Sequence, residues 1–471
     1  MRQPGHRPIV CLVSIQTHPG RGRGAPPCRQ ERPLPQSHPL LANYAQSFRC
    51  IGSDCEDTCC QGWGVPIDQA AYDKYQNLPP SPLRTLIDVS LLRMPEGAKP
   101  AIFAKFQMNG ANECPLLTAD RLCRIQAELG EELLSHACAT YPRIINSVGG
   151  IEEMALALSC PEAARLVLLN PELLTPASPA APSPPAFALS GAPSLMRWFW
   201  PIRQFVLAMV RNRAYPLWQR LFLLDLFCRQ LDTMAGGELQ RDVPAFLAGF
   251  QAAVASGTLL TAMETLPLDR AAQLDVVLRL AGMMLHRSNV RPRFMECVQA
   301  FTTGIGNGPG ATLESLAAHS AHAHDRYYAP FFDRHPYILE NYLVNTILRC
   351  RFPFGKEDAR SGEPFSLARE CAQLIAQFAL LKGLLIGVAG FHREAFSAAH
   401  VVHTVQAASK HFEHHPEFLN LAYELLVESR MDAARGMAIL LRNAEPAARQ
   451  PPVPGIYAPA PRDGREAATS F

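Results

Sequence analysis

Eight of the 14 cysteines in this chain fall between residues 50 and 160. The densest part reads Cys-Ile-Gly-Ser-Asp-Cys-Glu-Asp-Thr-Cys-Cys-Gln-Gly-Trp and ends at Trp63. A thiolate is the soft ligand that zinc ions and iron–sulfur clusters select, whereas cysteines that only fill a core need no such clustering. The sequence therefore predicts a metal or cluster site. The candidate ligands are Cys50, Cys55, Cys59, Cys60, Cys114, Cys123, Cys138 and Cys160.

The spacing of these cysteines argues against several familiar motifs. Cys55-x3-Cys59-Cys60 matches neither the paired Cys-x2-Cys of a zinc ribbon nor the Cys-x2-Cys-x2-Cys run of a ferredoxin. The Cys-x3-Cys-x2-Cys loop of standard radical S-adenosylmethionine enzymes would place its third cysteine at position 62, which is Gly62. The adjacent pair Cys59 and Cys60 can ligate together only if the backbone turns sharply there. Zinc and an iron–sulfur cluster both stay open as the bound group.

Composition narrows the class of protein. The chain has 471 residues, of which 48% are apolar and 18% are charged, so it is long enough for two or three domains with sizeable cores. Its net charge of +2 predicts no nucleic-acid partner. The most apolar stretch, 374–390, is interrupted by Gln377 and Lys382 and predicts a buried core helix, with no membrane span. Without a recognisable signal peptide, we expect a reducing cytoplasm, where clustered cysteines are more often metal ligands than disulfides.

The chain divides by composition into five segments. Residues 1–40 are rich in Arg and Pro and predict a disordered extension. Residues 41–170 form the cysteine-rich domain, and 171–193 form a Pro-rich linker. Residues 194–443 predict a helical domain, and 444–471 predict a disordered tail.

Helical periodicity dominates the second half of the chain. Apolar residues recur at helical spacing in 217–234, 337–350, 366–389 and 417–441. Strand signals are few, and Ile144–Glu152 predicts at most one short strand. The expected fold is therefore mainly α-helical, with a cysteine-rich metal- or cluster-binding N-terminal domain and a larger all-α C-terminal domain.

Longer motifs carry a resemblance to a known family. Phe48–Trp63, followed by Val-Pro-Ile-Asp at 65–68, resembles the opening signature of the flagellin lysine-N-methylase family. The later order is similar too: Cys-Pro-Leu-Leu from 114, Cys-Arg-Ile from 123, Tyr-Pro-Arg at 141–143, Leu-Ser-Cys-Pro-Glu-Ala-Ala at 158–164, and His-Pro-Tyr-Ile-Leu-Glu-Asn-Tyr-Leu-Val-Asn at 335–345. The resemblance covers roughly 41–430.

The resemblance implies an enzyme that transfers methyl groups from S-adenosylmethionine to flagellin lysines, with a [4Fe-4S] cluster in the cysteine-rich domain. The family's cysteine motif maps onto all eight cysteines but does not say which four ligate. We favour 50, 55, 59 and 60 as the local nucleus, completed by 114, 123 and 138, or accompanied by a second site there. The alternatives are structural zinc and a non-enzymatic zinc- or iron-chelating carrier or interaction protein. The long helical half favours the enzyme.

Methyl transfer requires a neutral lysine amine, held in line with the methyl group and shielded from water. Acidic and phenolic side chains that could orient the amine are Glu56, Asp57, Tyr141, Glu340 and Tyr342, together with Asp68 and Tyr72. Asn341 and Asn345 are candidates for cofactor binding, because they share a polar stripe on an otherwise apolar helix. For each of these, capping, surface charge or an interhelical polar network is the competing interpretation.

Overall fold

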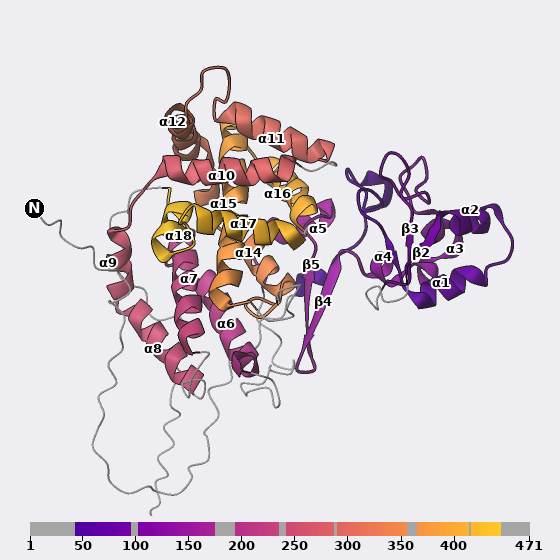
Figure 1. Ribbon diagram of the computed structural model, residues 1–471, viewed down its shortest axis with the longest axis horizontal. Helices are drawn as coiled ribbons and strands as arrows, with labels where there is room; N and C mark the ends of the chain where they lie inside the picture. Colours follow the sequence, from indigo (N-terminus) through magenta and orange to yellow (C-terminus); the bar gives the residue numbers. More distant parts are fainter. Residues whose placement is uncertain are drawn as a thin grey trace, which may run out of the picture.

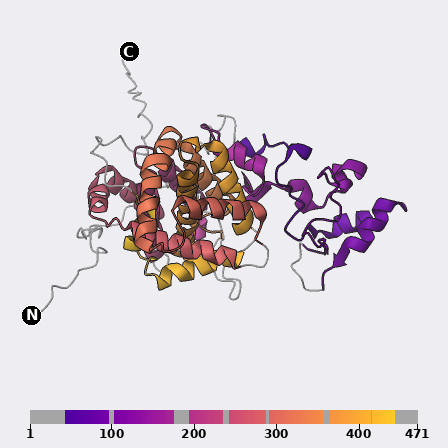
Figure 2. The ribbon, with the colours of Figure 1, turned by 90° about the horizontal axis from the view of Figure 1, so that it is seen from above.

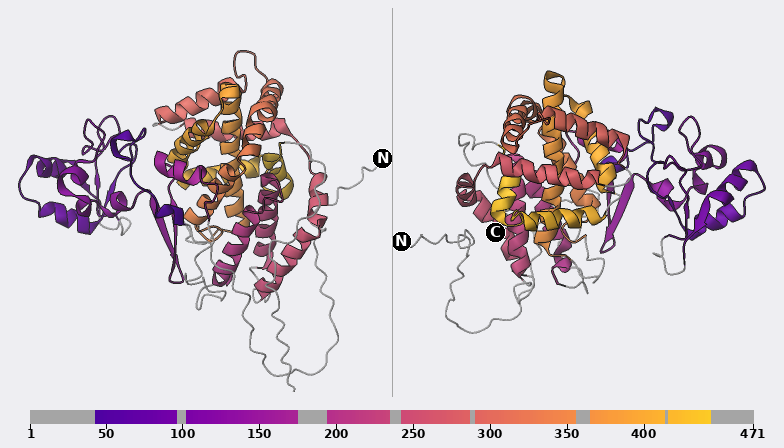
Figure 3. Two further views of the ribbon diagram at one scale, coloured as in Figure 1. Left: turned by 180° about the vertical axis from the view of Figure 1, so that it is seen from behind. Right: turned by 45° about the horizontal axis from the view of Figure 1, so that its top comes forward.

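The computed structural model describes residues 43–95, 102–174, 194–234, 242–286, 290–355, 365–413 and 416–443. The extension predicted at 1–40, the tail predicted at 444–471 and most of the linker predicted at 171–193 lie outside these ranges. Figure 1 shows a small N-terminal unit beside a larger helical body. The views from above and from behind agree that this outer unit lies at one side of the body (Figures 2 and 3).

The outer unit is built from short elements. Its helices are α1 (Gln69–Gln76), α2 (Pro82–Ser90), α3 (Arg124–Leu129) and α4 (His136–Thr140), and its strands are β1 (Pro66–Ile67), β2 (Leu91–Arg93) and β3 (Ala104–Phe106). The strands form an antiparallel sheet in the order β1-β3-β2. Asp68 caps α1 by accepting a 2.9 Å hydrogen bond from the Ala71 N–H. A small apolar core of its own, centred on Ile67, Tyr75 and Ile87, closes this unit.

A β-hairpin joins the outer unit to the body. Strands β4 (Arg143–Val148) and β5 (Ile151–Leu156) pair in antiparallel register, with Val148 opposite Ile151. Gly149 and Gly150 both have positive φ, at 61° and 81°, which a tight two-residue hairpin turn requires. The sequence predicted at most one short strand here, so that prediction was wrong. The second strand, β5, then leads to α5 (Pro161–Leu168), and both belong to the large core of the body.

The body consists of helices. They are α6 (Phe199–Val210), α7 (Leu217–Met234), α8 (Val243–Ala255), α9 (Thr258–Glu264), α10 (Arg270–Leu285), α11 (Pro292–Gly304), α12 (Leu313–Ala323), α13 (Ala329–Arg334), α14 (Tyr337–Arg349), α15 (Leu367–His392), α16 (Ala398–Phe412), α17 (Pro416–Glu428) and α18 (Ala434–Leu441). The mainly helical fold is therefore confirmed. The predicted helices at 217–234, 337–350 and 366–389 correspond to α7, α14 and α15, whereas the 417–441 stripe divides into α17 and α18.

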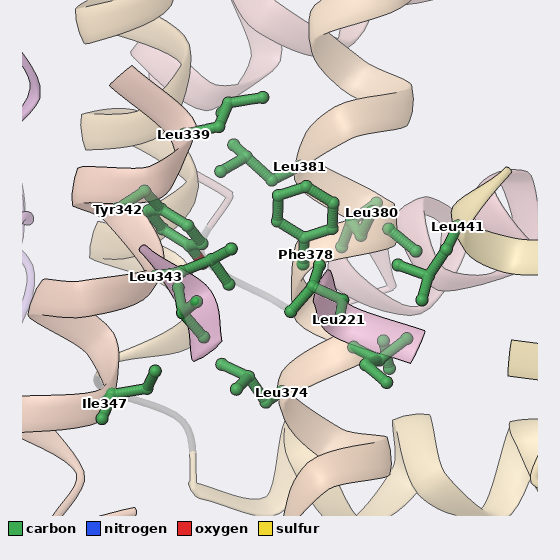
Figure 4. Close-up of a cluster of buried hydrophobic side chains, with 14 of the residues drawn as sticks. Leu221, Leu339, Tyr342, Leu343, Ile347, Leu374, Phe378, Leu380, Leu381 and Leu441 are labelled. Atoms are coloured by element: carbon green, nitrogen blue, oxygen red, sulfur yellow. The ribbon is translucent and has the colours of Figure 1, made fainter. Parts of the chain in front are cut away.

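Helix α15 forms the centre of the body and packs against α7, α10, α11, α12, α16, α17 and α18. By length and composition it could cross a membrane, but 89% of its most apolar window is buried inside the fold. Figure 4 shows Phe378 and Leu381 of this helix near Leu339 and Leu343 of α14. The prediction of a buried core helix is confirmed.

Glycines let α11 and α15 approach closely. A Cβ atom on Gly387 would lie 2.4 Å from the Phe301 ring and 2.6 Å from the Phe301 carbonyl oxygen. A Cβ atom on Gly304 would lie 1.8 Å from the Gly387 carbonyl oxygen. Side chains at these two positions would therefore force the helices apart.

Candidate functional site

Two of the predicted cysteines, Cys59 and Cys123, contact a third, Cys60, in the outer unit. The Cys60 thiol hydrogen-bonds to the sulfur atoms of Cys59 and Cys123. The chain positions them through backbone bonds, because the Cys114 N–H donates to the Cys60 carbonyl at 2.7 Å and Leu117 pairs with Cys123 in a β-bridge. The turn after Cys114 and the Leu117–Cys123 bridge thus bring distant cysteines near one another.

The hydrogen bonds of Cys60 shift the pKa values of the three thiols in different directions. Hydrogen bonding to Cys123 and Cys59 raises the pKa of Cys60. Hydrogen bonding from Cys60 lowers the pKa of Cys59 and takes the pKa of Cys123 to about 6. Cys123 therefore loses its proton more readily than an ordinary cysteine, and the thiolate is the form in which cysteines bind metal.

The remaining predicted cysteines lie around Cys59 in two groups. Cys114 and Cys138 interact electrostatically with Cys59 and Cys123, and burial raises their pKa values to about 11 and about 12. Cys55 interacts electrostatically with Cys50 and Cys59, and Cys160 interacts with Cys55 and Cys59. Cys59 therefore interacts both with the group that includes Cys60 and with the group that includes Cys160.

The donor atoms suit a soft metal ion or cluster in type, because several thiols lie near one another. Within the described residues, however, no three His, Cys, Asp or Glu side chains converge closely enough to hold a metal ion. The cysteines described there are all free thiols. The metal therefore stays a prediction at this site.

The cysteine loop is held against the body by a buried ion pair. Lys410 of α16 donates to one oxygen of the Asp57 carboxylate at 2.6 Å, and Gln406 of the same helix donates to the other at 2.7 Å. Lys410 also donates to the Thr58 carbonyl oxygen at 3.0 Å. Burial lowers the pKa of Lys410, and Asp57 opposes that shift. The ion pair fixes the loop two residues before Cys59.

A second contact explains the Gln-Gly-Trp sequence that follows the cysteine pair. Arg291 donates to the carbonyl oxygens of Gln61 at 2.9 Å and Gly62 at 2.7 Å. Gly62 has φ +88°, and a Cβ atom there would lie 2.1 Å from the Arg291 guanidinium. Glycine is therefore required both by the backbone and by the arginine. Trp63 closes the turn by donating its indole N–H to the Cys59 carbonyl at 2.7 Å.

The segment around Cys160 meets the same helix. Gln406 donates to the Ser159 carbonyl at 2.8 Å, while Glu413 accepts from the N–H groups of Leu158 and Ser159 at 3.1 and 3.2 Å. The predicted Tyr141 lies here, with its hydroxyl 3.1 Å from Ser159 Oγ. Burial raises the pKa of Tyr141, so it stays a neutral phenol. The two cysteine-bearing segments are thereby joined to α16.

Three of the four predicted carboxylates are paired with a cation, and the fourth, Asp68, accepts from backbone N–H groups. Glu56 accepts from Arg165 at 2.6 Å, and Asp57 accepts from Lys410. Glu340 lies in the body, away from these contacts, where Arg213 and Arg220 bond to its two oxygens at 2.9 and 2.8 Å. Asp68 caps α1 and also accepts from the His136 N–H at 2.8 Å. These pairings orient the carboxylates within the fold.

The polar stripe of α14 connects the body to the hairpin. Asn345 exchanges hydrogen bonds with the Leu156 backbone at 2.8 and 3.1 Å, and Asn341 donates to the Val167 carbonyl at 3.0 Å. Tyr342 is 1% exposed and packs in the core between α14 and α15. The structure therefore places Asn341 and Asn345 at the contacts of α14 with α5 and β5, and Tyr342 in the apolar core, rather than beside the cysteines.

Sequence reasoning missed Lys410, Gln406 and Arg291. The available signal was weak: Gln406 and Lys410 are polar residues one turn apart on a helix that buries apolar side chains and several other polar ones. Nothing in the sequence paired them with Asp57, which is more than 300 positions away.

The fold and this junction define a mainly helical protein with a cysteine-rich unit docked on its body. The sequence model of the FliB lysine N-methylase C-terminal domain matches residues 203–440. The chain therefore belongs to the FliB lysine N-methylase family. The matched residues contain the Arg291, Gln406 and Lys410 side of the junction, and the eight clustered cysteines lie outside them.

Curated relatives agree with this assignment. The lysine-N-methylases of Salmonella typhimurium (strain LT2) and Salmonella choleraesuis are each 26% identical to the chain over 234 residues, covering 46% of this chain and 55% of the relative. The flagellar biosynthetic protein FliU of Salmonella muenchen is 30% identical over 132 residues, 28% of this chain and 77% of that protein. The chain spans a little over half the length of the two lysine-N-methylases. No solved structure matches it.

Proposed function

We propose that this protein is a lysine N-methyltransferase that transfers methyl groups from S-adenosylmethionine to lysine side chains of flagellin. The match of residues 203–440 to a lysine N-methylase domain carries the proposal. The name of the FliU relative adds a flagellar link, which supports flagellin as the substrate. We propose a cytoplasmic location, which the burial of the central helix α15 inside the body supports.

The reaction forms a bond between the lysine nitrogen and the methyl carbon while the bond from that carbon to sulfur breaks. S-adenosylhomocysteine leaves, and the amine loses a proton. A free lysine has a pKa near 10.4, so the site must desolvate the amine or supply a base. Glu56 and Asp57 each hold a cation already. We therefore assign these two to positioning the cysteine loop and leave the proton acceptor unassigned.

We propose in addition that the cysteines hold an iron–sulfur cluster, with zinc as the alternative. Cys59, Cys60 and Cys123 would form its nucleus, because Cys60 already contacts the other two, and Cys114 and Cys138 interact electrostatically with Cys59 and Cys123. A bound metal would join three segments of a unit whose own apolar core is small, and metal binding of this kind contributes directly to folding.

Anaerobic purification followed by iron, sulfide and zinc analysis tests the metal. Incubation with flagellin and S-adenosylmethionine, read out by mass spectrometry of methyl-lysine, tests the activity. We expect iron with sulfide, and methylated flagellin. Zinc without iron would exclude the cluster. A metal-loaded protein that methylates no flagellin would favour the non-enzymatic carrier.

Cysteine variants test the ligand assignment. Cys59→Ala and Cys123→Ala should each lose metal and activity, and so should Cys55→Ala if both groups around Cys59 contribute. Cys297→Ala is the matched control, because Cys297 is a buried thiol of α11 in the body. Full metal retention by Cys59→Ala would show that this cysteine is a packing residue.

A further inference from the structure

The contacts of α16 reach both cysteine-bearing segments. We propose that Gln406 and Lys410 are positioning residues for the Cys59–Cys60 loop, so that the helical body controls how the cysteine thiols are arranged to take a metal. This inference rests on the proposed metal-binding role of the cysteines. It does not depend on methyl transfer.

The geometry leaves the loop little freedom. Gln406 and Lys410 lie one turn apart on α16, and each binds a different oxygen of Asp57. Lys410 binds the Thr58 carbonyl as well, and the Thr58 hydroxyl accepts from the Cys60 N–H at 3.2 Å. One continuous set of hydrogen bonds therefore runs from α16 to the backbone of the cysteine pair.

The side chains that make these hydrogen bonds are buried between the loop and α16, so the bonds depend on the loop staying docked. Lys410 is 3% exposed, Gln406 is 0% exposed and Asp57 is 9% exposed. The Asp57 carboxylate and the Lys410 ammonium can both be buried because each neutralises the other's charge. Removing one partner would leave the other as an unpaired charge shielded from water. The loop should therefore leave its docked position when Lys410 is lost.

Gln406 extends the same control to the second cysteine segment. Its single amide nitrogen bonds both to Asp57, two residues before Cys59, and to the carbonyl of Ser159, one residue before Cys160. Through this side chain the spacing between the two segments follows the position of α16. A purely local role in one loop would not require this double contact.

Hydrogen–deuterium exchange on the full-length, reduced, metal-free protein tests the positioning directly. Lys410→Met should raise amide exchange in peptides covering 57–63 and 157–161 by about tenfold or more, because the loop opens. Lys382→Met is the matched control. Lys382 is another buried lysine of the body, which donates to the carbonyls of Leu440 and Leu441 instead. It should alter exchange near 440 and leave 57–63 unchanged.

Metal affinity gives the second readout, with Zn²⁺ alone as the probe in competition with a chelator. Lys410→Met should weaken Zn²⁺ binding by about tenfold or more, Lys382→Met should not, and Lys410→Arg should restore part of the affinity because it keeps the charge. Unchanged exchange at 57–63 in a folded Lys410→Met protein would overturn the proposal.

Two further experimental outcomes also test the proposal. If Lys410→Met fails to fold, Gln406→Met keeps the ion pair and must still raise exchange in both segments, and an unchanged pattern would overturn the proposal. If wild-type protein binds no Zn²⁺, zinc is excluded as the bound metal, while the exchange result still decides the positioning role. Neither readout uses flagellin or S-adenosylmethionine, so failure of the methyltransferase assignment is visible separately.

Discussion

The helical body and the outer unit are stabilised by different interactions. The body surrounds a long buried helix, α15, whose glycines allow close packing against α11. The outer unit has strands of only two or three residues and a small apolar core, and it depends on turns, hydrogen bonds and thiol contacts. The contrast suggests that apolar packing specifies the body, whereas cysteine chemistry and contacts from the body specify the outer unit.

The largest loss of stability is expected from Glu340→Ala. Glu340 is 3% exposed and holds Arg220, which is 4% exposed. Removing the carboxylate leaves Arg220 without its charge partner and should lower the free energy of unfolding by about 3–5 kcal/mol, measured by urea denaturation. Glu428→Ala removes an exposed partner of Arg279 and should change it by less than about 1 kcal/mol. Lost methylation with unchanged stability would instead make Glu340 a catalytic residue.

The next largest effect tests the close packing of the body. Gly387→Val places atoms where the Phe301 ring and carbonyl already lie, so it should cost about 3 kcal/mol in the same measurement. Gly282→Ala is the matched control, because a Cβ atom there has nothing within 4 Å and alanine is the better helix former. Equal stability of the two variants would contradict the close approach of α11 and α15.

The helical body and the N-terminal part of the chain also differ in how much of their structure the sequence predicts. Helices α7, α14 and α15 follow from apolar residues at helical spacing, because a buried helix must carry such a stripe. The β4–β5 hairpin was missed although Gly149 and Gly150 form a turn typical of hairpins. The weak alternation in these two strands concealed it.

The candidate site was predictable only in part. The cysteine cluster can be recognised in the sequence because many of its cysteines lie close together along the chain and have distinctive neighbouring residues. The Asp57–Lys410 pair joins residues more than 300 positions apart, and no local pattern relates them. Likewise, the sequence left open whether Asn341 and Asn345 bind a cofactor or join a polar network, and only the fold shows that they bond to the Val167 and Leu156 backbones.

A pH-dependent effect of intermediate size is expected in the body. Burial lowers the pKa of Lys382 from 10.5 to about 7. Between these values the unfolded chain binds more protons than the folded protein, so this group makes the folded state more stable as pH rises from about 7 to about 10.5. As pH rises, the free energy of unfolding of the wild type should increase relative to that of Lys382→Met by up to about 1.4 kcal/mol per pH unit. A difference that stays constant over this range would contradict a neutral buried lysine.

The smallest change in stability is expected for an exposed ion pair at the junction between the outer unit and the body. Arg165 pairs with Glu56, the neighbour of Asp57, but their side chains are 34% and 35% exposed. Water already solvates both groups, so Arg165→Met should lower the free energy of unfolding by less than about 1 kcal/mol. Amide exchange at 57–63 should change far less than in Lys410→Met, although the two ion pairs hold adjacent residues. Equal effects would mean that surface charge, and not the buried contact with α16, holds the cysteine loop against the body.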